Sequence, residues 1–159
     1  AQISSILCDK FKLTDIGDYA YTGGLLHDIG KIVLRGLHKN TIDKVISIST
    51  EKGISLSVME TLLEGSNHAK IGAKMALKWE LPENIVNIIK FHENPLASPD
   101  EVKDISKIVY LAHIIDSRLN NSNETQIYDE DLILEGFGIT EESHLDALVI
   151  YVRNKLGRV

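Results

Sequence analysis

The sequence of 159 residues contains very little cysteine and proline and no long apolar run. Cys8 is the only cysteine, so a disulfide within the chain is excluded and a reducing cytoplasm is the simplest compartment. No apolar stretch approaches the roughly 18 residues that a membrane-spanning helix needs, so we expect no membrane segment. The chain has three prolines and no stretch that resembles a linker. These absences predict one cytoplasmic domain spanning residues 1–159.

The chain also lacks an excess of positive charge. Its formal net charge is -6, which argues against a general nucleic-acid surface, because binding to phosphates is driven by clustered Lys and Arg. A local basic spot could still hold a small phosphate ester. Hydrophobic residues make up 43% of the chain, enough for a folded core.

No period-two alternation is long enough to predict a sheet, whereas apolar residues recur at helical spacing nearly throughout. We therefore expect an all-α fold. The first expected helices cover residues 3–11, a segment from Thr14 or Asp15 through His27, and a segment capped by Asn40 and stopped by Gly53. A short helix is opened by the capping box Ser57–Glu60 and ends at Gly65. Ser66 or Asn67 opens a helix that runs to about Glu80, and Leu81-Pro82-Glu83 starts another that ends at His92-Glu93. The last two expected helices cover about residues 102–120 and 141–156. Residues 120–126 are the expected loop.

Two interpretations concern packing within these helices. The small residues Ala69, Gly72, Ala73 and Ala76 recur at helical spacing, which usually indicates close contact with another helix. Trp79 is expected in the core, at the end of the same helix.

Each of four expected helices directs an imidazole towards apolar surface. His27, His68 and His92 continue apolar series on their helices, and His113 lies three residues from Asp116 beside Val109. A single histidine on an apolar face is usually a hydrogen-bonded core residue. Four such placements indicate a shared arrangement, because buried polar groups are costly unless they are paired. The other two histidines do not fit this scheme and are expected at the surface. His38 follows Arg35-Gly36-Leu37 at an expected helix end, and His144 lies in the first turn of the last expected helix.

The inward side chains could satisfy one another or share a cation. Imidazole and carboxylate together suit Zn, Fe, Mn or Ni. The residues alone leave both alternatives open.

The run G-L-L-H-D-I-G-K (residues 24–31) resembles the signature of the HD superfamily of metal-dependent phosphohydrolases. Residues 64–95, E-G-S-N-H-A-K-I-G-A-K-M-A-L-K-W-E-L-P-E-N-I-V-N-I-I-K-F-H-E-N-P, are similar to the HDOD branch, the HD-related output domain of bacterial signalling proteins. The resemblance extends from near the N-terminus to about Leu119. It implies an HD-domain-like helical bundle of about seven to nine helices.

The resemblance also implies roles for particular residues. His27 and Asp28 match the metal-binding pair of active members, and His68 and His92 match the additional histidines of multi-metal versions. Lys31 matches a lysine that contacts phosphate in the cyclic-dinucleotide phosphodiesterase branch. Independently, a lysine three residues after Asp28 could hold an anion near a bound cation.

Three departures separate this chain from the family pattern. None of its six histidines precedes His27, although family members carry one on the preceding helix. The closing Asp of the family aligns with His113, and Asp116 lies one turn further on. Where family members have two adjacent histidines before the proline, this chain has His92 and Glu93. We therefore expect that this chain is missing an N-terminal helix or upstream region and is a fragment or one region of a larger signalling protein.

Three hypotheses follow from these residues. The first is a bacterial output or regulatory domain with a degenerate HD-type metal site, which binds a signalling partner or an upstream sensor or receiver domain. The second is an active phosphohydrolase of a nucleotide or cyclic-nucleotide phosphodiester, in which Asp28 and Lys31 are catalytic. In both, His27, Asp28, His68, His92, His113 and Asp116 are the expected ligands of a divalent transition metal. The third is a helical module whose histidines bond to one another.

Overall fold

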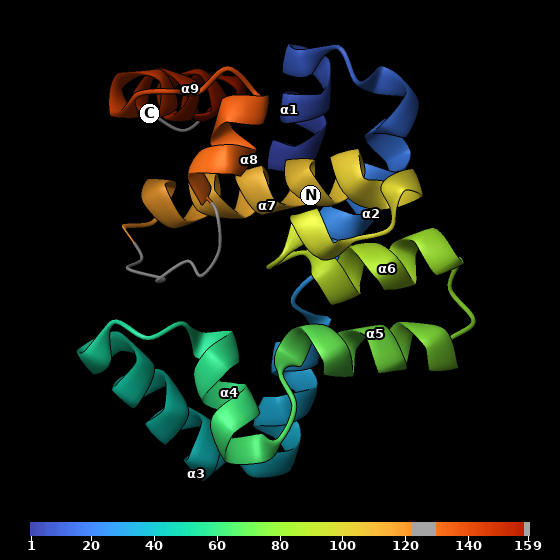
Figure 1. Cartoon of the computed structure of the whole chain (residues 1–159), viewed down its shortest axis with the longest axis vertical. Coiled ribbons are helices and arrows are strands. Elements are labelled where there is room, and N and C mark those ends of the chain that lie inside the picture. Colours follow the sequence, from blue (N-terminus) through green and yellow to red (C-terminus); the bar gives the residue numbers. More distant parts are fainter. Residues whose placement is uncertain (122–129, 158–159) are drawn as a thin grey trace.

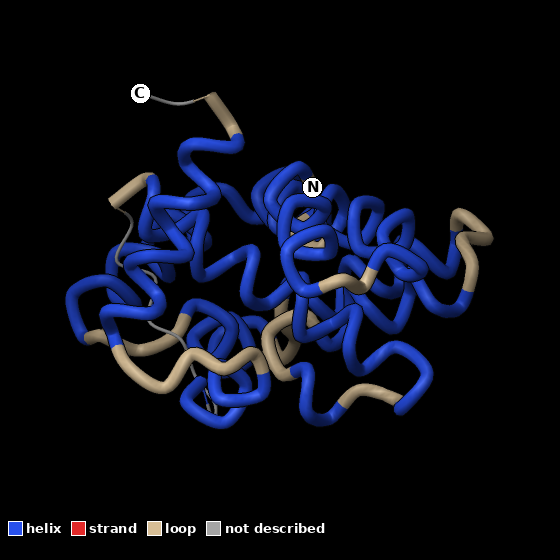
Figure 2. The backbone as a smooth tube through the Cα atoms, turned by 90° about the horizontal axis from the view of Figure 1, so that it is seen from above, coloured by secondary structure: helices blue, strands red, loops and turns tan. Residues whose placement is uncertain are grey.

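We analysed a computed structural model of the chain, which describes residues 1–121 and 130–157. Within these ranges the protein is entirely helical, with nine α-helices and two short 3-10 helices (Figures 1 and 2). The elements are α1 (Gln2–Phe11), η1 (Thr14–Ile16), α2 (Gly17–Leu26), α3 (Ile29–Lys52), α4 (Leu56–Glu64), α5 (His68–Lys78), α6 (Glu83–Phe91), η2 (Pro95–Ala97), α7 (Asp100–Leu119), α8 (Glu130–Gly136) and α9 (Glu142–Lys155). The predicted all-α class and helix number are confirmed.

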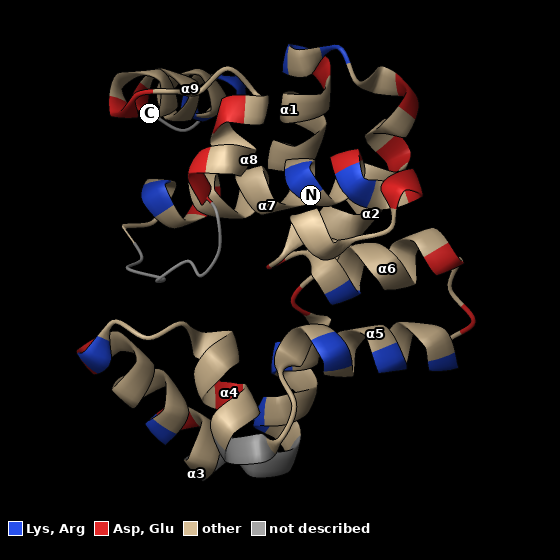
Figure 3. Cartoon of the chain, viewed as in Figure 1, with Lys and Arg blue, Asp and Glu red and all other residues tan. Residues whose placement is uncertain are grey.

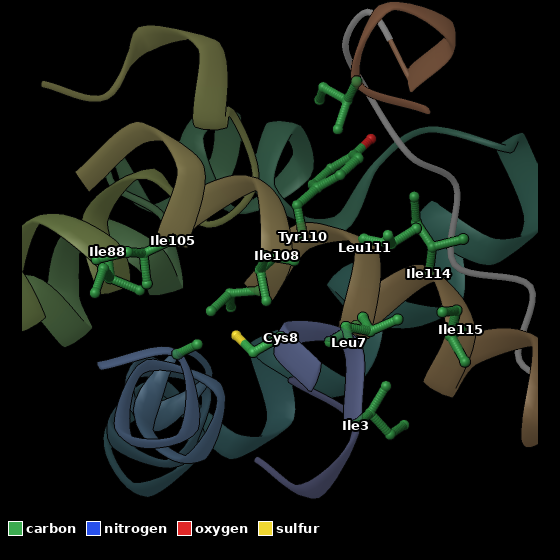
Figure 4. Close-up of a cluster of buried hydrophobic side chains, with 14 of the residues drawn as sticks. Ile3, Leu7, Cys8, Ile88, Ile105, Ile108, Tyr110, Leu111, Ile114 and Ile115 are labelled. Carbon is green, nitrogen blue, oxygen red and sulfur yellow. The ribbon is translucent and has the colours of Figure 1, made fainter. Parts of the chain in front are cut away.

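The core lies around α7, which packs against α1, α2, α6 and α9. Ile108, Leu111 and Ile115 of α7 are fully buried and meet Leu7 and Cys8 of α1 (Figure 4). Burial raises the pKa of the Cys8 thiol to about 11, so this cysteine is a packing residue. The apolar face expected for α9 is also buried, through Leu145, Leu148, Val149 and Val152.

Helices α3, α4 and α5 form the lower part of the molecule in Figure 1, below α6 and α7. Helix α5 packs on α3 and on α6, and so connects the two parts. Several local signals place these helices as expected. Asn67 caps α5 by accepting a hydrogen bond from the Lys70 backbone N–H, and Pro82 is the N-cap of α6.

The structure corrects the expected third helix. Helix α3 runs without a break from Ile29 to Lys52, so Asn40 does not cap a helix and the chain at His38 is not a helix end. The pair Arg35-Gly36 resembles a stop signal, but a glycine inside a helix costs only about 1 kcal/mol relative to alanine. Packing of α3 against α4 and α5 outweighs that cost. The stop at Gly53 is confirmed, with φ 60°.

Three further expectations need comment. Trp79 is 50% exposed at the C-terminal end of α5, so its placement in the core was wrong. Helix α8 was not predicted. The expected loop at residues 120–126 lies mostly outside the described residues. None of the helices in the described ranges is long and apolar enough to cross a bilayer.

Candidate metal centre

Close contact between backbones brings the His27-Asp28 pair to the other histidines. The pair connects α2 to α3, and Gly30 follows in the first turn of α3. A Cβ atom on Gly30 would lie 1.9 Å from the carbonyl oxygen of His68 and 2.8 Å from the backbone nitrogen of Gly72. Only glycine permits this approach. The expectation that the small residues of α5 make a close helix contact is therefore confirmed, and this contact places Asp28 beside His68.

A similar contact places α2 against α6. A Cβ atom on Gly23 would lie 2.5 Å from Cγ2 of Ile88. His27 follows the end of α2 and His92 follows the end of α6. Their rings consequently meet edge to face, with centroids 5.0 Å apart.

Three imidazoles have the same nitrogen engaged in a hydrogen bond. Nδ1 of His27 lies 3.0 Å from the carbonyl oxygen of Gly24, and Nδ1 of His92 lies 2.7 Å from that of Ile89. Nδ1 of His68 lies 2.7 Å from Oε2 of Glu60. Because carbonyl and carboxylate oxygens only accept, all three Nδ1 atoms must donate. In each neutral ring the lone pair is therefore on Nε2.

These Nε2 atoms converge on the Asp28 carboxylate. Nε2 of His68 and Nε2 of His92 lie 3.3 Å apart, and they lie 3.5 and 3.7 Å from Oδ1 of Asp28. A point equidistant from these three atoms is about 2.0 Å from each, which matches the roughly 2.0–2.2 Å bonds of zinc to imidazole and carboxylate ligands. The donor set and its spacing thus fit a divalent transition-metal ion.

The second carboxylate oxygen faces a second group of ligands. Oδ2 of Asp28 lies 3.4 Å from Nε2 of His27. The ligand atoms of His27, Asp28 and His113 lie within 4.8 Å of one another. Within the described part of the chain, His27 Nε2 and Asp28 Oδ1 are buried atoms with no hydrogen-bond partner. Such atoms require an explanation, and a bound cation supplies one.

The charges at the centre favour an ionised Asp28. Burial alone would raise the pKa of its carboxyl group, but the His27 imidazole, the Lys31 ammonium and the other two imidazoles hold that pKa well below its usual range. Lys31 donates to Oδ2 of Asp28 at 3.0 Å. Asp28 is therefore available as an anionic ligand across the whole physiological pH range.

The imidazoles differ in their affinity for protons. Burial lowers the pKa of His27 to about 4 and also lowers the pKa of His92 well below its ordinary value. Burial opposes protonation of His68 as well, but its hydrogen bond to Glu60 and the charges of Glu93 and Glu60 raise its pKa. A proton on Nε2 of His68 can then be donated to Nε2 of His92.

Glu60 corrects one prediction from the sequence. Helix α4 begins at Leu56 with Ser55 as its N-cap, so Ser57 and Glu60 do not form a capping box. The Glu60 carboxylate is 1% exposed and accepts hydrogen bonds from both the backbone N–H and Nδ1 of His68, each at 2.7 Å. Glu60 thus orients His68, as carboxylates commonly orient metal-binding histidines.

Glu93 is a second carboxylate at the centre. Its Oε1 lies 3.4 Å from Nε2 of His68, so it could act as a further ligand. Glu93 stands where the family pattern has a second histidine, and that departure was the only signal in the sequence. Asp116 is exposed and is absent from both ligand groups found among the described residues.

A cavity of about 490 Å³ opens beside the second ligand group. Its lining includes His27, Asp28, His113 and Asp116, together with residues of α1 and α7. Asp116 therefore lies on the wall of the cavity, near the ligands. The cavity is within the size range of small-molecule sites, about 300–1,000 Å³.

The fold and this centre define the class: an all-helical domain with an HD-type His-Asp pair that could hold a metal ion. The HDOD domain model matches residues 1–95, which is more than half of the chain. The chain belongs to the HDOD family. The matched region contains His27, Asp28, His68 and His92 but ends before His113.

Bacterial proteins are similar to this chain in sequence or in fold. An uncharacterised protein of Treponema pallidum (strain Nichols) is 35% identical over 95 residues, which are 60% of this chain and 18% of that protein. A solved HDOD domain protein from Geobacter sulfurreducens has a TM-score of 0.71 at 22% identity, covering 96% of this chain and 57% of that one. A Shewanella amazonensis SB2B structure, whose description assigns it to the phosphohydrolases, has a TM-score of 0.70 at 22% identity, covering 99% and 58%.

At this identity the two structures establish the fold alone. The chain spans 18% of the Treponema protein and a little over half of each solved chain.

Proposed function

We propose that this HDOD domain binds a divalent transition-metal ion through Asp28, His68 and His92 and acts as an output domain of a bacterial signalling protein. The observation that carries the proposal is the convergence of two imidazole lone pairs on Oδ1 of Asp28, with N–N and N–O separations of 3.3–3.7 Å. Mixed imidazole and carboxylate ligands favour Fe, Mn, Zn or Ni. His27 and His113 extend the centre on the side of Oδ2.

The three proposed ligands lie at the ends of three different helices. His68 begins α5, His92 follows α6, and Asp28 precedes α3. A shared ion would hold these three helix ends together, so the relative position of the helices would depend on metal occupancy. The expected partner is a signalling protein or an upstream sensor or receiver domain, in the cytoplasm.

A second candidate function is hydrolysis of a nucleotide or cyclic-nucleotide phosphodiester. It is favoured by the cavity of about 490 Å³ that reaches His27 and Asp28. When bound, a metal ion at this centre supplies Lewis acidity towards a phosphate ester. The chain itself supplies the Lys31 ammonium beside Asp28, which would stabilise negative charge on a phosphate.

Metal analysis followed by a nucleotide hydrolysis panel separates these functions. Bound metal without turnover supports the output domain. Bound metal with turnover that disappears in His27→Ala and Asp28→Asn supports the hydrolase. If metal is absent and His27→Ala only lowers stability, the histidines are structural and both proposals are wrong.

A further inference from the structure

A second cavity lies on another side of the domain, between α4, α5 and the segment that follows α6. Its volume is about 420 Å³. We call it the α4 groove and define it by its apolar lining residues Val58, Leu62, Phe91 and Ala97 and its basic lining residues Lys70 and Lys90. Leu62, which lines the groove, is 71% exposed. The groove therefore presents apolar surface to solvent.

The charged side chains of the groove are mostly basic. Lys70 and Lys90 are exposed, and no carboxylate in the described ranges lies within ion-pair distance of either ammonium group. Glu93 also lines the groove, but its carboxylate is directed to Nε2 of His68 at 3.4 Å. The Lys90 ammonium lies 4.8 Å from the centre of the Phe91 ring and remains exposed there. Both lysines can therefore pair with carboxylates from outside the domain.

Lys70 also begins a row of like charges along α5. Lys70, Lys74 and Lys78 are spaced four residues apart and are all exposed, and Figure 3 shows basic positions along this helix. Like charges at this spacing destabilise a helix. Lys70 lies in the first turn, which has no acidic residue and where positive charge is unfavourable. Repulsion within this row of lysines lowers the stability of α5, and the carboxylates of an acidic partner would offset that repulsion.

We propose that the α4 groove binds an acidic amphipathic segment of a partner protein. Apolar side chains of the segment would contact Leu62, Val58 and Phe91, and its carboxylates would pair with Lys70 and Lys90. The apolar lining favours a peptide over a free phosphate. The apolar lining also favours a peptide over nucleic acid, whose binding depends mainly on phosphates that contact clustered Lys and Arg.

The test uses two fluorescent peptides that share leucines three and four residues apart and differ in their charged positions, Glu in one and Lys in the other. Binding to the purified chain is measured by fluorescence anisotropy in chelator, so the outcome does not depend on whether the centre binds metal. The expected result is binding of the Glu peptide that weakens with added salt, and binding of the Lys peptide that is about tenfold weaker or more.

Variants then locate the binding surface. Lys70→Glu/Lys90→Glu should reverse the preference between the two peptides, and Leu62→Ser should weaken binding of both. Lys52→Glu is the matched control, because Lys52 is exposed on α3 and does not line the groove. Circular dichroism verifies that each variant is folded. Equal binding of the two peptides, or an unchanged preference in the double variant, would overturn the proposal.

Discussion

The Nε2 atoms of His68 and His92 face each other at 3.3 Å, although the Nδ1 atom of each ring already donates a hydrogen bond. Two neutral imidazoles in this arrangement would direct two lone pairs at one another beside an ionised carboxylate. A proton or a metal ion between the two nitrogen atoms would remove this repulsion.

Glu60 should influence metal affinity although it is not a ligand. Glu60→Ala removes the acceptor of Nδ1 of His68, so the ring can take the other tautomer and Nε2 loses its lone pair. We expect metal affinity to fall by roughly 10–100-fold, as for other residues that orient metal-binding histidines. Glu60→Gln retains an acceptor for Nδ1 and should therefore lower the metal affinity less than Glu60→Ala does. Isothermal titration calorimetry measures the affinities, and ¹⁵N chemical shifts of His68 report its tautomer.

Glu51→Ala is the control for that series, because Glu51 is exposed on α3. An affinity in Glu60→Ala equal to that of Glu51→Ala would show that Glu60 does not orient His68.

Gly30 and Gly36 lie in the same helix, and replacing each by alanine should change the free energy of unfolding in opposite directions. A Cβ atom on Gly30 would lie 1.9 Å from the His68 carbonyl, so α3 and α5 must separate. We expect Gly30→Ala to lower the free energy of unfolding by several kcal/mol, on the order of the larger single-residue effects, and to weaken metal binding. Nothing lies within 4 Å of a Cβ atom on Gly36. Gly36→Ala should therefore stabilise the domain by about 0.4–1 kcal/mol.

Urea unfolding of the two variants provides the comparison. Equal stability of Gly30→Ala and Gly36→Ala would mean that α3 and α5 are not in backbone contact at this point.

The metal-free protein should lose stability in mild acid. The pKa of His27 falls from about 6.5 in the unfolded chain to about 4 in the folded protein. Because the unfolded state binds a proton that the folded state rejects, stability is fully present above about pH 6.5 and decreases as the pH falls towards 4. His27 contributes up to about 3 kcal/mol to this loss. His92 acts in the same direction, whereas the raised pKa of His68 acts in the opposite one.

His27→Gln tests that assignment. The free energy of unfolding, measured in urea at a series of pH values with chelator present, should fall less steeply between pH 6.5 and 4 in this variant. An unchanged slope would assign the acid sensitivity to other groups.

Metal binding should release a proton at pH values below the pKa of His68. Burial opposes protonation of this ring, but the hydrogen bond to Glu60 and the charge of Glu93 raise its pKa, so Nε2 holds a proton over a wider pH range and a metal ion must displace it there. Affinity should rise as the pH increases through the pKa of His68. Calorimetric titration in buffers of different ionisation enthalpy measures the number of protons released. A heat of binding that is independent of the buffer would argue against a protonated His68.

Local signals allowed much of the fold to be predicted from the sequence. The Asn67 cap, the Pro82 start and the apolar faces of α7 and α9 each depend on residues near one another in the chain. Errors arose where one local pattern suits two structures. Arg35-Gly36 resembles a helix end, and Ser57–Glu60 resembles a capping box, but tertiary packing continues α3 and turns Glu60 inward.

The same limit applies to the candidate centre. Helical spacing identified His27, His68, His92 and His113 as inward, because an apolar face is visible in the sequence. Glu60, which accepts the hydrogen bond from His68, lies eight positions earlier in the chain and on another helix, so spacing within one helix cannot reveal the pair. Trp79 shows the reverse error, since an aromatic residue at a helix end was assigned to a core that does not extend there.

The most direct test of the central claim is the metal content of the purified chain after incubation with Fe, Mn, Zn or Ni and dialysis, measured by mass spectrometry. Asp28→Asn/His68→Gln removes two of the three proposed ligands, and His144→Gln serves as the control because His144 is exposed on α9. The account predicts at least one equivalent of one of these metals in the wild-type chain and in His144→Gln, and a loss of that metal in the double variant. Equal metal content in all three proteins, or none in the wild-type chain, would contradict it.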